Sequence, residues 1–294
     1  MTIKHKIISK LKKIVHIFGF TKLETSNEFI KYTAIEEYLD KKINQVKKND
    51  PFNLCGYEYQ VFSQNGEDGI LQEIFNRIGT SNKYFVEFGV GDGIENNTAS
   101  LLLNGWKGSW IEGSDKNNAI IQKKLSKLLK SEKLNLLKSF ITKNNIIDHF
   151  QNLEIPKDFD LLSIDIDGND YWVWKALKDY SPRVVVIEYN GSLGPHLNWT
   201  MPYDENHMWG GKTKGNYFGA SLKALELLGN DLGYHLVGTN LSGVNAFFIR
   251  KDLVDEKLFN GPYTSESTFN KPLYFLGRRL GHLRNHEILD NISN

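Results

Sequence analysis

The chain of 294 residues has one cysteine, Cys55, and only seven prolines. A single thiol cannot form an intrachain disulfide and cannot supply a cysteine-based zinc site, which fits a reducing compartment. The small number of prolines, with 40% hydrophobic and 12% aromatic residues, excludes collagen-like and low-complexity character. These residues are enough to bury a sizeable core, so we expect a globular protein.

Long apolar runs and a charge imbalance are also missing. No stretch of 18 or more apolar residues is present to span a bilayer. The first residues are interrupted by lysines too often for the apolar region of a signal peptide, and no small-residue cleavage site follows them. With 36 basic and 35 acidic side chains, the net charge of +1 gives no electrostatic argument for nucleic acid. We therefore predict a cytoplasmic protein that does not bind nucleic acid.

The positive charge is concentrated at the beginning of the chain, where residues 1–23 carry several lysines and no acid. Apolar residues recur there at helical spacing, which predicts a basic amphipathic helix. This helix could contact an anionic membrane surface or a protein partner, or it could dock on its own domain with the lysines in solvent. A second helical pattern over residues 28–46 ends in a polar segment, so we predict a helical extension over residues 1–50 and a catalytic domain over residues 51–294.

From residue 84 onward, short apolar segments alternate with helical patterns, which is typical of a parallel sheet with helices on both faces. The segment at residues 233–250 contains two further strands joined by a short turn, which predicts a hairpin. We therefore predict an α/β fold: a Rossmann-like doubly wound sheet, mostly parallel, with an antiparallel terminal strand. The predicted strands are residues 84–88, 109–112, 134–139, 161–165, 184–189, 233–238 and 245–250, and the predicted helices include 94–104, 169–179 and 221–232.

A glycine-rich turn follows the first predicted strand, in the segment that runs from Glu87 to Gly93 with Gly89 and Gly91 between them. Glycines at the carboxyl end of a strand allow a tight turn and let a ligand approach the backbone. The dinucleotide pattern would need a third glycine at position 94, which is Ile94. The spacing therefore favours a ligand with a positive centre and few phosphates over a pyrophosphate.

Two more carboxylates are predicted at strand ends beside this turn. Glu112 closes the second strand, where it could accept hydrogen bonds from ribose hydroxyls, and Asp165 closes the fourth strand. Open α/β sheets bind ligands at this edge. Together with Glu87, these acids predict a site for a cationic adenosyl compound, although each acid alone could be an ordinary helix cap.

Residues 61–253 resemble the class I S-adenosylmethionine-dependent methyltransferases, and in particular the FkbM-like family. The resemblance implies that Gly89, Gly91 and Gly93 line the methionine part of S-adenosylmethionine, that Glu112 holds the ribose, and that Glu87 lies near the methionine amine. We include Asp92 and Asp165 in this predicted cofactor site. The family usually has lysine and glutamate where this chain has Ser163 and Asp167, which leaves the acceptor open. The matching segments are residues 63–68, 86–93, 110–114 and 159–168.

The segment from Asp165 to Asp170 permits other interpretations. A strand followed by D-x-D-G resembles the nucleophile motif of haloacid-dehalogenase-type phosphatases, but position 169 is Asn instead of Thr or Ser, and a complete glycine-turn unit precedes the motif. An EF-hand is excluded because its required glycine would fall on Asp170. The oxygen ligands could hold Mg²⁺. Alternatively, Asp167 and Asn169 could cap the following helix.

The long connection over residues 188–215 is the predicted acceptor-binding segment, because long irregular loops in compact domains are usually functional. His196 and His207 are candidate general bases, with Asp167 as a third catalytic candidate. Glu188 and Asn190 could hydrogen-bond the acceptor. Aromatic and polar residues in this segment suit a sugar or another polar ring.

The sequence thus predicts an S-adenosylmethionine-dependent O-methyltransferase acting on a small polar or glycosyl acceptor, with surface-polysaccharide or natural-product assembly as the context that the family suggests. Two alternatives stay open. One is a non-catalytic binding or scaffold protein with the same fold, and the other is a Mg²⁺-dependent phosphatase.

Overall fold

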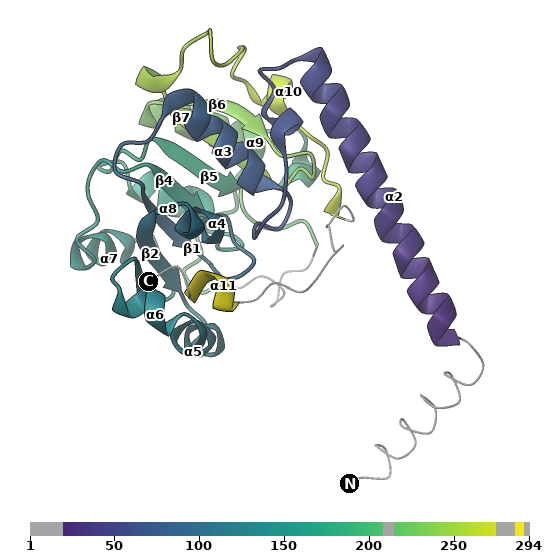
Figure 1. Ribbon diagram of the computed structural model, residues 1–294. Helices are drawn as coiled ribbons and strands as arrows, with labels where there is room; N and C mark the ends of the chain where they lie inside the picture. The colour runs from purple at the N-terminus through teal and green to yellow at the C-terminus, as the bar shows by residue number, and fades with distance from the viewer. Residues whose placement is uncertain (1–19, 208–214, 275–285, 291–294) are drawn as a thin grey trace.

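The computed structural model describes residues 20–207, 215–274 and 286–290. The basic helix predicted within residues 1–19 lies outside these ranges. The described chain forms a layered α/β domain with one long helix, α2 (Phe20–Asn49), beside it (Figure 1).

A seven-stranded sheet forms the middle of the domain, in the order β3-β2-β1-β4-β5-β7-β6. The first five strands are parallel, and β7 runs antiparallel to both β5 and β6. This is the topology of the class I methyltransferase fold, so the predicted fold class is confirmed. The strands are β1 (Tyr84–Phe88), β2 (Lys107–Glu112), β3 (Leu134–Lys138), β4 (Leu161–Ile164), β5 (Val184–Glu188), β6 (Tyr234–Thr239) and β7 (Asn245–Arg250).

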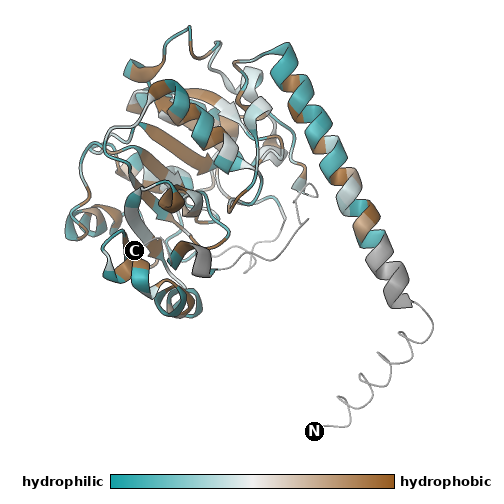
Figure 2. Cartoon of the chain, viewed as in Figure 1, coloured by the Kyte–Doolittle hydropathy of each residue, from teal (hydrophilic) through white to brown (hydrophobic). Residues whose placement is uncertain are grey.

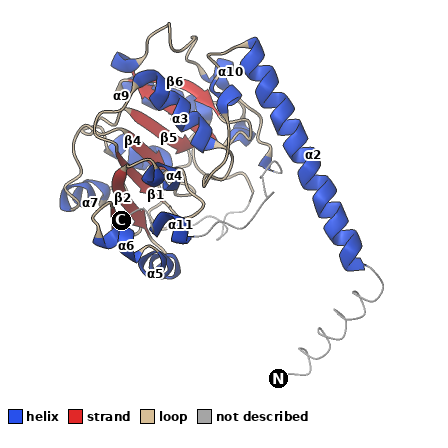
Figure 3. Ribbon diagram, viewed as in Figure 1, coloured by secondary structure: helices blue, strands red, loops and turns tan. Residues whose placement is uncertain are grey.

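Both faces of the sheet are covered by helices (Figure 3), and each face has its own apolar core. One core receives Phe150, Trp174 and Leu225 from helices on the first face. The other receives Ile70 and Leu102 from helices on the second face. Strands β4 and β5 can be apolar at almost every position because both of their faces are buried. The first face carries α7 (Ile146–Asn152), α8 (Asp170–Ala176) and α9 (Leu222–Leu232), and the second carries α3 (Glu67–Ile78), α4 (Ala99–Leu103), α5 (Asp115–Lys124), α6 (Ser126–Lys130) and α11 (His286–Asp290).

The helix predicted over residues 94–104 is wrong in its first half, because α4 begins only at Ala99. The backbone N–H groups of Asn97 and Thr98 donate to the buried carboxylate of Glu87, at 2.9 and 3.1 Å. These two residues therefore lie in a turn that donates hydrogen bonds to Glu87, and not in the helix. The helix predicted over residues 169–179 is likewise shorter and ends at Ala176.

Short elements complete the chain outside the sheet. They are the 3-10 turns η1 (Leu54–Tyr57), η2 (Gly191–Leu193) and η3 (Lys251–Leu253), and the single helical turn α10 (Ser265–Thr268). The turn η1 lies between α2 and α3, where Asn53 caps it by accepting a hydrogen bond from the Cys55 N–H.

Helix α2 contacts the domain through an apolar stripe and, near its end, through Lys47, which lies over the ring of Tyr57. Ile35 and Leu39 are buried against Cys55 and Leu241, and the outward surface of the helix is largely hydrophilic in Figure 2. The first turns of α2 extend away from the domain, and Phe29 is 65% exposed there. Within the described ranges, no helix combines the length and apolar character needed to cross a membrane. The end of α2 at Asn49 agrees with the predicted boundary at residue 50, which stays a prediction as a division between domains.

Candidate functional site

The carboxyl ends of β1, β4 and β5 place a row of polar side chains on one face of the sheet. Glu87 of β1 pairs in register with Ser163 of β4, and Glu188 of β5 pairs with Asn245 of β7. Side chains alternate between faces along a strand, so Asp165, two residues after Ser163, continues the row. All of these residues lie on the face that α3 and α4 cover. The predicted convergence of acids at this edge is therefore found.

Gly89 allows the turn after β1 to contact the loop after β4. Its φ of +70° lies in the left-handed region, and an added Cβ would lie 1.8 Å from the carbonyl oxygen of Asp165. Its N–H also donates to the carbonyl oxygen of Ile111, at 3.1 Å. Only glycine fits this position.

Gly91 forms the open part of the turn. Its φ is +58°, and no atom lies within 4 Å of an added Cβ. The Gly91 N–H donates to Oε2 of Glu112 at 2.9 Å, and the Ser114 N–H donates to Oε1 of Glu112 at 2.7 Å. Because a carboxylate has about four acceptor positions, Glu112 can still accept from a ligand hydroxyl. Gly93, in contrast, packs on the ring of Trp110, which an added Cβ would approach to 2.8 Å.

Asp92 is half-buried at the tip of the turn, and its backbone has a partner far along the chain. The carbonyl oxygen of Asp92 lies 2.8 Å from Nε2 of His286, in α11. Helix α11 is held in turn by the buried Leu289 and by Asp290, whose Oδ1 accepts the Lys127 N–H. Nothing in the sequence pattern of residues 286–290 indicates this contact, and we did not predict it.

Glu87 is buried, and its carboxylate is surrounded by donors from the protein. Besides the N–H groups of Asn97 and Thr98, it accepts from the Thr98 hydroxyl at 2.5 Å and from the Ser163 hydroxyl at 3.0 Å. Burial nevertheless raises the pKa of Glu87 to about 7, because these neutral donors only partly offset the loss of hydration. Glu87 thus holds the turn before α4, and its predicted proximity to a methionine amine stays a prediction.

Asp170 shapes the loop after β4. Its buried carboxylate accepts the N–H groups of Ile166, at 2.9 Å, and Gly168, at 2.8 Å, and burial raises its pKa to about 6. Asn169 occupies the cap position of α8 without a side-chain capping bond. Its Nδ2 instead donates to the carbonyl oxygen of Asp204, at 2.8 Å. The interpretation of Asn169 as a side-chain cap is therefore wrong, because this amide ties the loop to the predicted acceptor segment.

Asp165, Asp167 and Glu188 form a compact acidic cluster. One carboxylate oxygen from each residue lies within 4.8 Å of the others. Burial raises the pKa values of Asp165 and Glu188 well above their usual range, and repulsion from neighbouring acids raises them further. The pKa of Asp167 is also raised by burial, while His207 lowers it. In the described part of the chain, no hydrogen bond or salt bridge reaches these three carboxylates.

The two candidate histidines have different surroundings. The ring of His207 lies against Gly168, where an added Cβ would be 2.4 Å from its Cδ2, and thus beside Asp167. Its Nε2 is buried with no hydrogen-bond partner among the described residues. The His196 side chain is 79% exposed, and its Nδ1 lies 3.5 Å from Oε1 of Glu266. The structure therefore brings only His207 together with the acidic cluster.

Asn190 does not have the predicted role at the acceptor. It is fully buried, and its Nδ2 donates to the carbonyl oxygens of Asn216, at 2.8 Å, and Phe218, at 2.9 Å. Its Oδ1 accepts from the Ser192 hydroxyl. These contacts tie the beginning of the acceptor segment to residues 216–218, just after its end, so Asn190 has a structural role.

A second polar group, missed in the sequence, lies beside the row. Glu67, at the start of α3, is fully buried and accepts from Nδ2 of Asn240, at 2.7 Å, and of Asn245, at 2.9 Å. Its charge contributes to the raised pKa of Asp165. The resemblance of residues 63–68 to the methyltransferase family was the signal in the sequence that could have indicated Glu67. The position of Glu67 over the sheet edge, however, depends on long-range packing.

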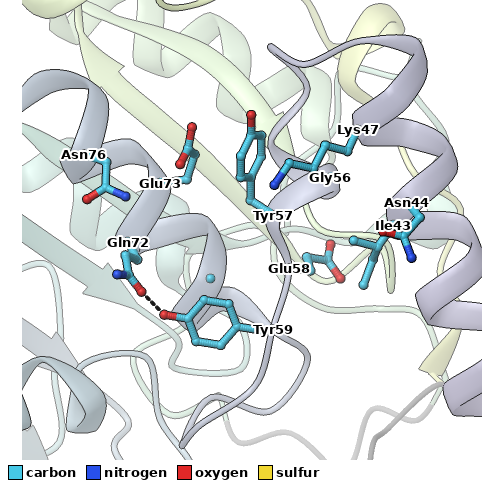
Figure 4. A pocket seen from close by; sticks show the side chains of 11 residues that line it. Ile43, Asn44, Lys47, Gly56, Tyr57, Glu58, Tyr59, Gln72, Glu73 and Asn76 are labelled. Atoms are coloured by element: carbon cyan, nitrogen blue, oxygen red, sulfur yellow. Dashed lines mark hydrogen bonds between the residues drawn. The ribbon is translucent and has the colours of Figure 1, made fainter.

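A pocket of about 380 Å³ lies elsewhere, between α2, η1 and α3 (Figure 4). In Figure 4 the side chain of Lys47 extends toward Tyr57, and its Nζ is 4.2 Å from the ring centroid. The Tyr59 hydroxyl hydrogen-bonds to Gln72 at the other side. None of the strand-end acids lines this pocket, so it is separate from the candidate site.

Comparisons with solved structures find methyltransferases that are similar to this chain at low sequence identity and low TM-score. An O-methyltransferase from Bacillus cereus, solved with SAH, is 17% identical over 52% of this chain and 66% of its own, with a TM-score of 0.34. The glycopeptide N-methyltransferase MtfA, solved with sinefungin, is 15% identical over 64% of this chain and 87% of its own, with a TM-score of 0.38. A SAM-dependent methyltransferase from Aquifex aeolicus is 14% identical over 71% of this chain and 96% of its own, with a TM-score of 0.35.

No protein-family model matches this chain, and no curated protein matches it. The fold assignment accordingly rests on the strand order and strand directions of the chain itself.

Proposed function

We propose that this protein is an S-adenosylmethionine-dependent methyltransferase of the FkbM-like kind, which methylates a hydroxyl of a small polar or glycosyl acceptor. The observation that carries the proposal is the open turn at Gly91, held by Glu112, in a sheet of this strand order. Ligands bind open α/β sheets at this carboxyl edge. The names of the similar solved structures agree with this class.

The described residues fit the cofactor in shape and charge. Gly91 leaves open space where any side chain would project, and Glu112 retains acceptor capacity for ribose hydroxyls. The backbone of Asp165 meets the same turn at Gly89, so Asp165 lies at the same edge of the sheet as Gly91 and Glu112. We assign Gly89, Gly91, Asp92, Gly93 and Glu112 to cofactor binding.

S-adenosylmethionine supplies an already activated methyl group when it is bound. The protein must therefore align the acceptor, exclude water and accept the proton of an attacking hydroxyl. The Nε2 of His207 has no hydrogen-bond partner among the described residues, and the carboxylate of Asp167 lies beside this histidine, which suits a general base. Asn169 fixes the acceptor segment at Asp204, and so it helps to position His207.

Calorimetry with S-adenosylmethionine tests cofactor binding directly. We expect micromolar affinity for the unchanged chain and no binding for Gly91→Arg, because the new side chain would fill the open space. Gly105→Arg is a matched control, since Gly105 has a φ of +76° and no atom within 4 Å of an added Cβ, but lies in the exposed turn before β2. No heat of binding at millimolar cofactor would contradict the proposed function.

Methyl transfer to a panel of sugars and polar hydroxyl compounds separates an enzyme from a scaffold. His207→Ala should lose turnover while keeping cofactor affinity, whereas His196→Ala should keep both. Cofactor binding without transfer to any acceptor would favour the scaffold alternative.

The place of the D-x-D-G segment in the fold argues against the phosphatase alternative. The D-x-D-G segment follows β4, and the strands β1, β2 and β3 come before it in the sequence. That alternative predicts hydrolysis of an aryl phosphate that requires Asp165 and Mg²⁺, and we expect no such activity.

A further inference from the structure

We propose that the pocket between α2, η1 and α3 binds a neutral saccharide, at a site separate from the strand-end acids. Its volume of about 380 Å³ lies within the range of about 300–1,000 Å³ that is usual for small-molecule sites. Figure 4 shows side chains from α2 on one side of this pocket and side chains from α3 on the other. The proposal does not require that the chain transfer a methyl group.

Two glycines hold the helices on either side of the pocket close to its floor. Gly56 lies in η1, and a Cβ added to it would be 2.9 Å from Cα of Lys47 in α2. Gly69 lies in α3, and a Cβ added to it would be 2.1 Å from the carbonyl oxygen of Tyr57. The Gly69 N–H also donates to the carbonyl oxygen of Tyr59, at 3.1 Å. The pocket is therefore formed by close backbone packing, and an ordered site of this kind costs less entropy to bind.

The charged side chains that line the pocket already have partners in the protein. Nζ of Lys47 lies 4.2 Å from the ring centroid of Tyr57. Oε1 of Glu73 accepts from Nε of Arg77, at 2.8 Å. Glu58 is only 6% exposed, and its carboxylate accepts a backbone N–H. A strongly charged ligand would have to replace one of these contacts, so the pocket favours a neutral ligand.

The amide side chains of the pocket, in contrast, are available to a ligand. Asn44 of α2 and Asn76 of α3 have no side-chain hydrogen bond to another described residue. Gln72 accepts from the Tyr59 hydroxyl, which leaves its Nε2 without a partner in the described part of the chain. Tyr59 itself is 41% exposed. Because an amide offers both donors and an acceptor, these groups match a ligand with several neighbouring hydroxyls.

A sugar fits these groups better than a peptide does. Among the described residues that line the pocket, none belongs to a strand, so no sheet edge is present to pair with an extended peptide. Ile43 is the only aliphatic side chain in this set, which gives little apolar surface for the anchoring residues of a peptide. A sugar ring can present its hydroxyls to the amides and its C–H face to Tyr59.

Saturation-transfer NMR of the full chain with glucose, galactose, mannose and N-acetylglucosamine, without cofactor, tests this proposal. We expect at least one of these sugars to bind with a dissociation constant on the order of 10⁻³ M, which a few hydrogen bonds can supply. Gln72→Ala and Asn76→Ala should each weaken this affinity by about three- to ten-fold, and Tyr59→Ala by about ten-fold. Gln151→Ala, which removes an exposed amide of α7, should leave it unchanged.

The side-chain amide signals in ¹⁵N–¹H spectra locate the bound sugar. The signals of Gln72 and Asn76, each assigned by its absence from the corresponding alanine variant, should shift when the sugar is added, whereas the signal of Gln151 should not. No binding of any of the four sugars at tens-of-millimolar concentration overturns the proposal. Sugar binding that shifts neither pocket amide also overturns it, because the sugar would then lie elsewhere, as at the proposed acceptor segment. Cofactor affinity is measured separately by calorimetry, so failure of this proposal can be told from failure of the proposed function.

Discussion

The acids at the two halves of the carboxyl edge of the sheet have opposite surroundings. The first half is formed by the ends of β1 and β2, and the second by the ends of β4 and β5. At β1 and β2, the carboxylates of Glu87 and Glu112 accept hydrogen bonds from backbone N–H and hydroxyl groups. At β4 and β5, Asp165, Asp167 and Glu188 face one another, and no described residue donates to them. An acid whose oxygens accept from the backbone shapes its loop, whereas acids that face other acids repel one another and gain no such stabilisation. The acids of the first half therefore hold their loops, whereas those of the second half have no hydrogen-bond partner among the described residues.

The free energy of unfolding should be most sensitive to substitution at the contact between the two halves. Gly89→Ala would place a methyl group 1.8 Å from the Asp165 carbonyl oxygen at a φ of +70°, so the two loops would have to separate. We expect a loss of more than about 3 kcal/mol in the free energy of unfolding, measured by urea denaturation. Gly91→Ala, which meets no atom, should cost only about 1 kcal/mol of backbone strain. Equal losses would show that the halves do not depend on this contact.

Glutamine substitutions should have opposite effects in the two halves. Glu112→Gln places an amide group against the N–H of Gly91 or Ser114, and should lower the free energy of unfolding by about 1–3 kcal/mol. Glu188→Gln removes repulsion within the acidic cluster, and should leave stability unchanged or raise it when a chelator is present. Urea denaturation at pH 8 with EDTA compares them. Destabilisation by both would contradict the division between the halves.

The raised pKa of Glu87, in the first half, predicts that the free energy of unfolding depends on pH. Its folded pKa of about 7 lies above the usual 4.5, so the folded state binds the proton more tightly than the unfolded state. The resulting stabilisation is complete below about pH 4.5 and is lost as the pH rises through 7. Relative to Glu87→Gln, the free energy of unfolding should fall by about 2–3 kcal/mol between pH 5 and 8. Parallel pH profiles for the two proteins would contradict this.

The smallest effect should come from removing residues 2–23. Helix α2 contacts the domain through Ile35 and Leu39, well beyond this segment. The free energy of unfolding should change by less than about 0.5 kcal/mol, and cofactor affinity should not change. Sedimentation with anionic vesicles should detect a loss of association if the basic segment contacts membranes. A large loss of stability would mean that the segment belongs to the core.

Much of the fold could be predicted because local patterns determine it. The strands from Tyr84 to Phe88 and from Asn245 to Arg250 have the predicted bounds, since apolar segments flanked by turn residues define their own ends. The helix predicted from Ile94 begins only at Ala99, because the carboxylate of Glu87, on the preceding strand, accepts the N–H groups of Asn97 and Thr98. Tertiary contacts of this kind are not visible in periodicity.

The sequence predicted where the candidate site lies, but not which side chains contact one another there. The rule that strand ends converge placed Glu87, Glu112 and Asp165 at one edge correctly. Pairing depends on side chains that come from far apart in the chain, such as Asn245 beside Glu188 and Asn240 with Glu67. For the same reason, Asn169 and Asn190 have structural contacts that their positions in the sequence did not indicate.

The bond between His286 and the carbonyl oxygen of Asp92 has a consequence for the order of folding. The two residues are 194 positions apart, so closing this contact costs far more chain entropy than any local turn of the glycine segment. During synthesis on the ribosome, the sheet strands through β7 emerge before α11 does. The contact between α11 and the glycine turn should therefore form late, after the central sheet has already assembled.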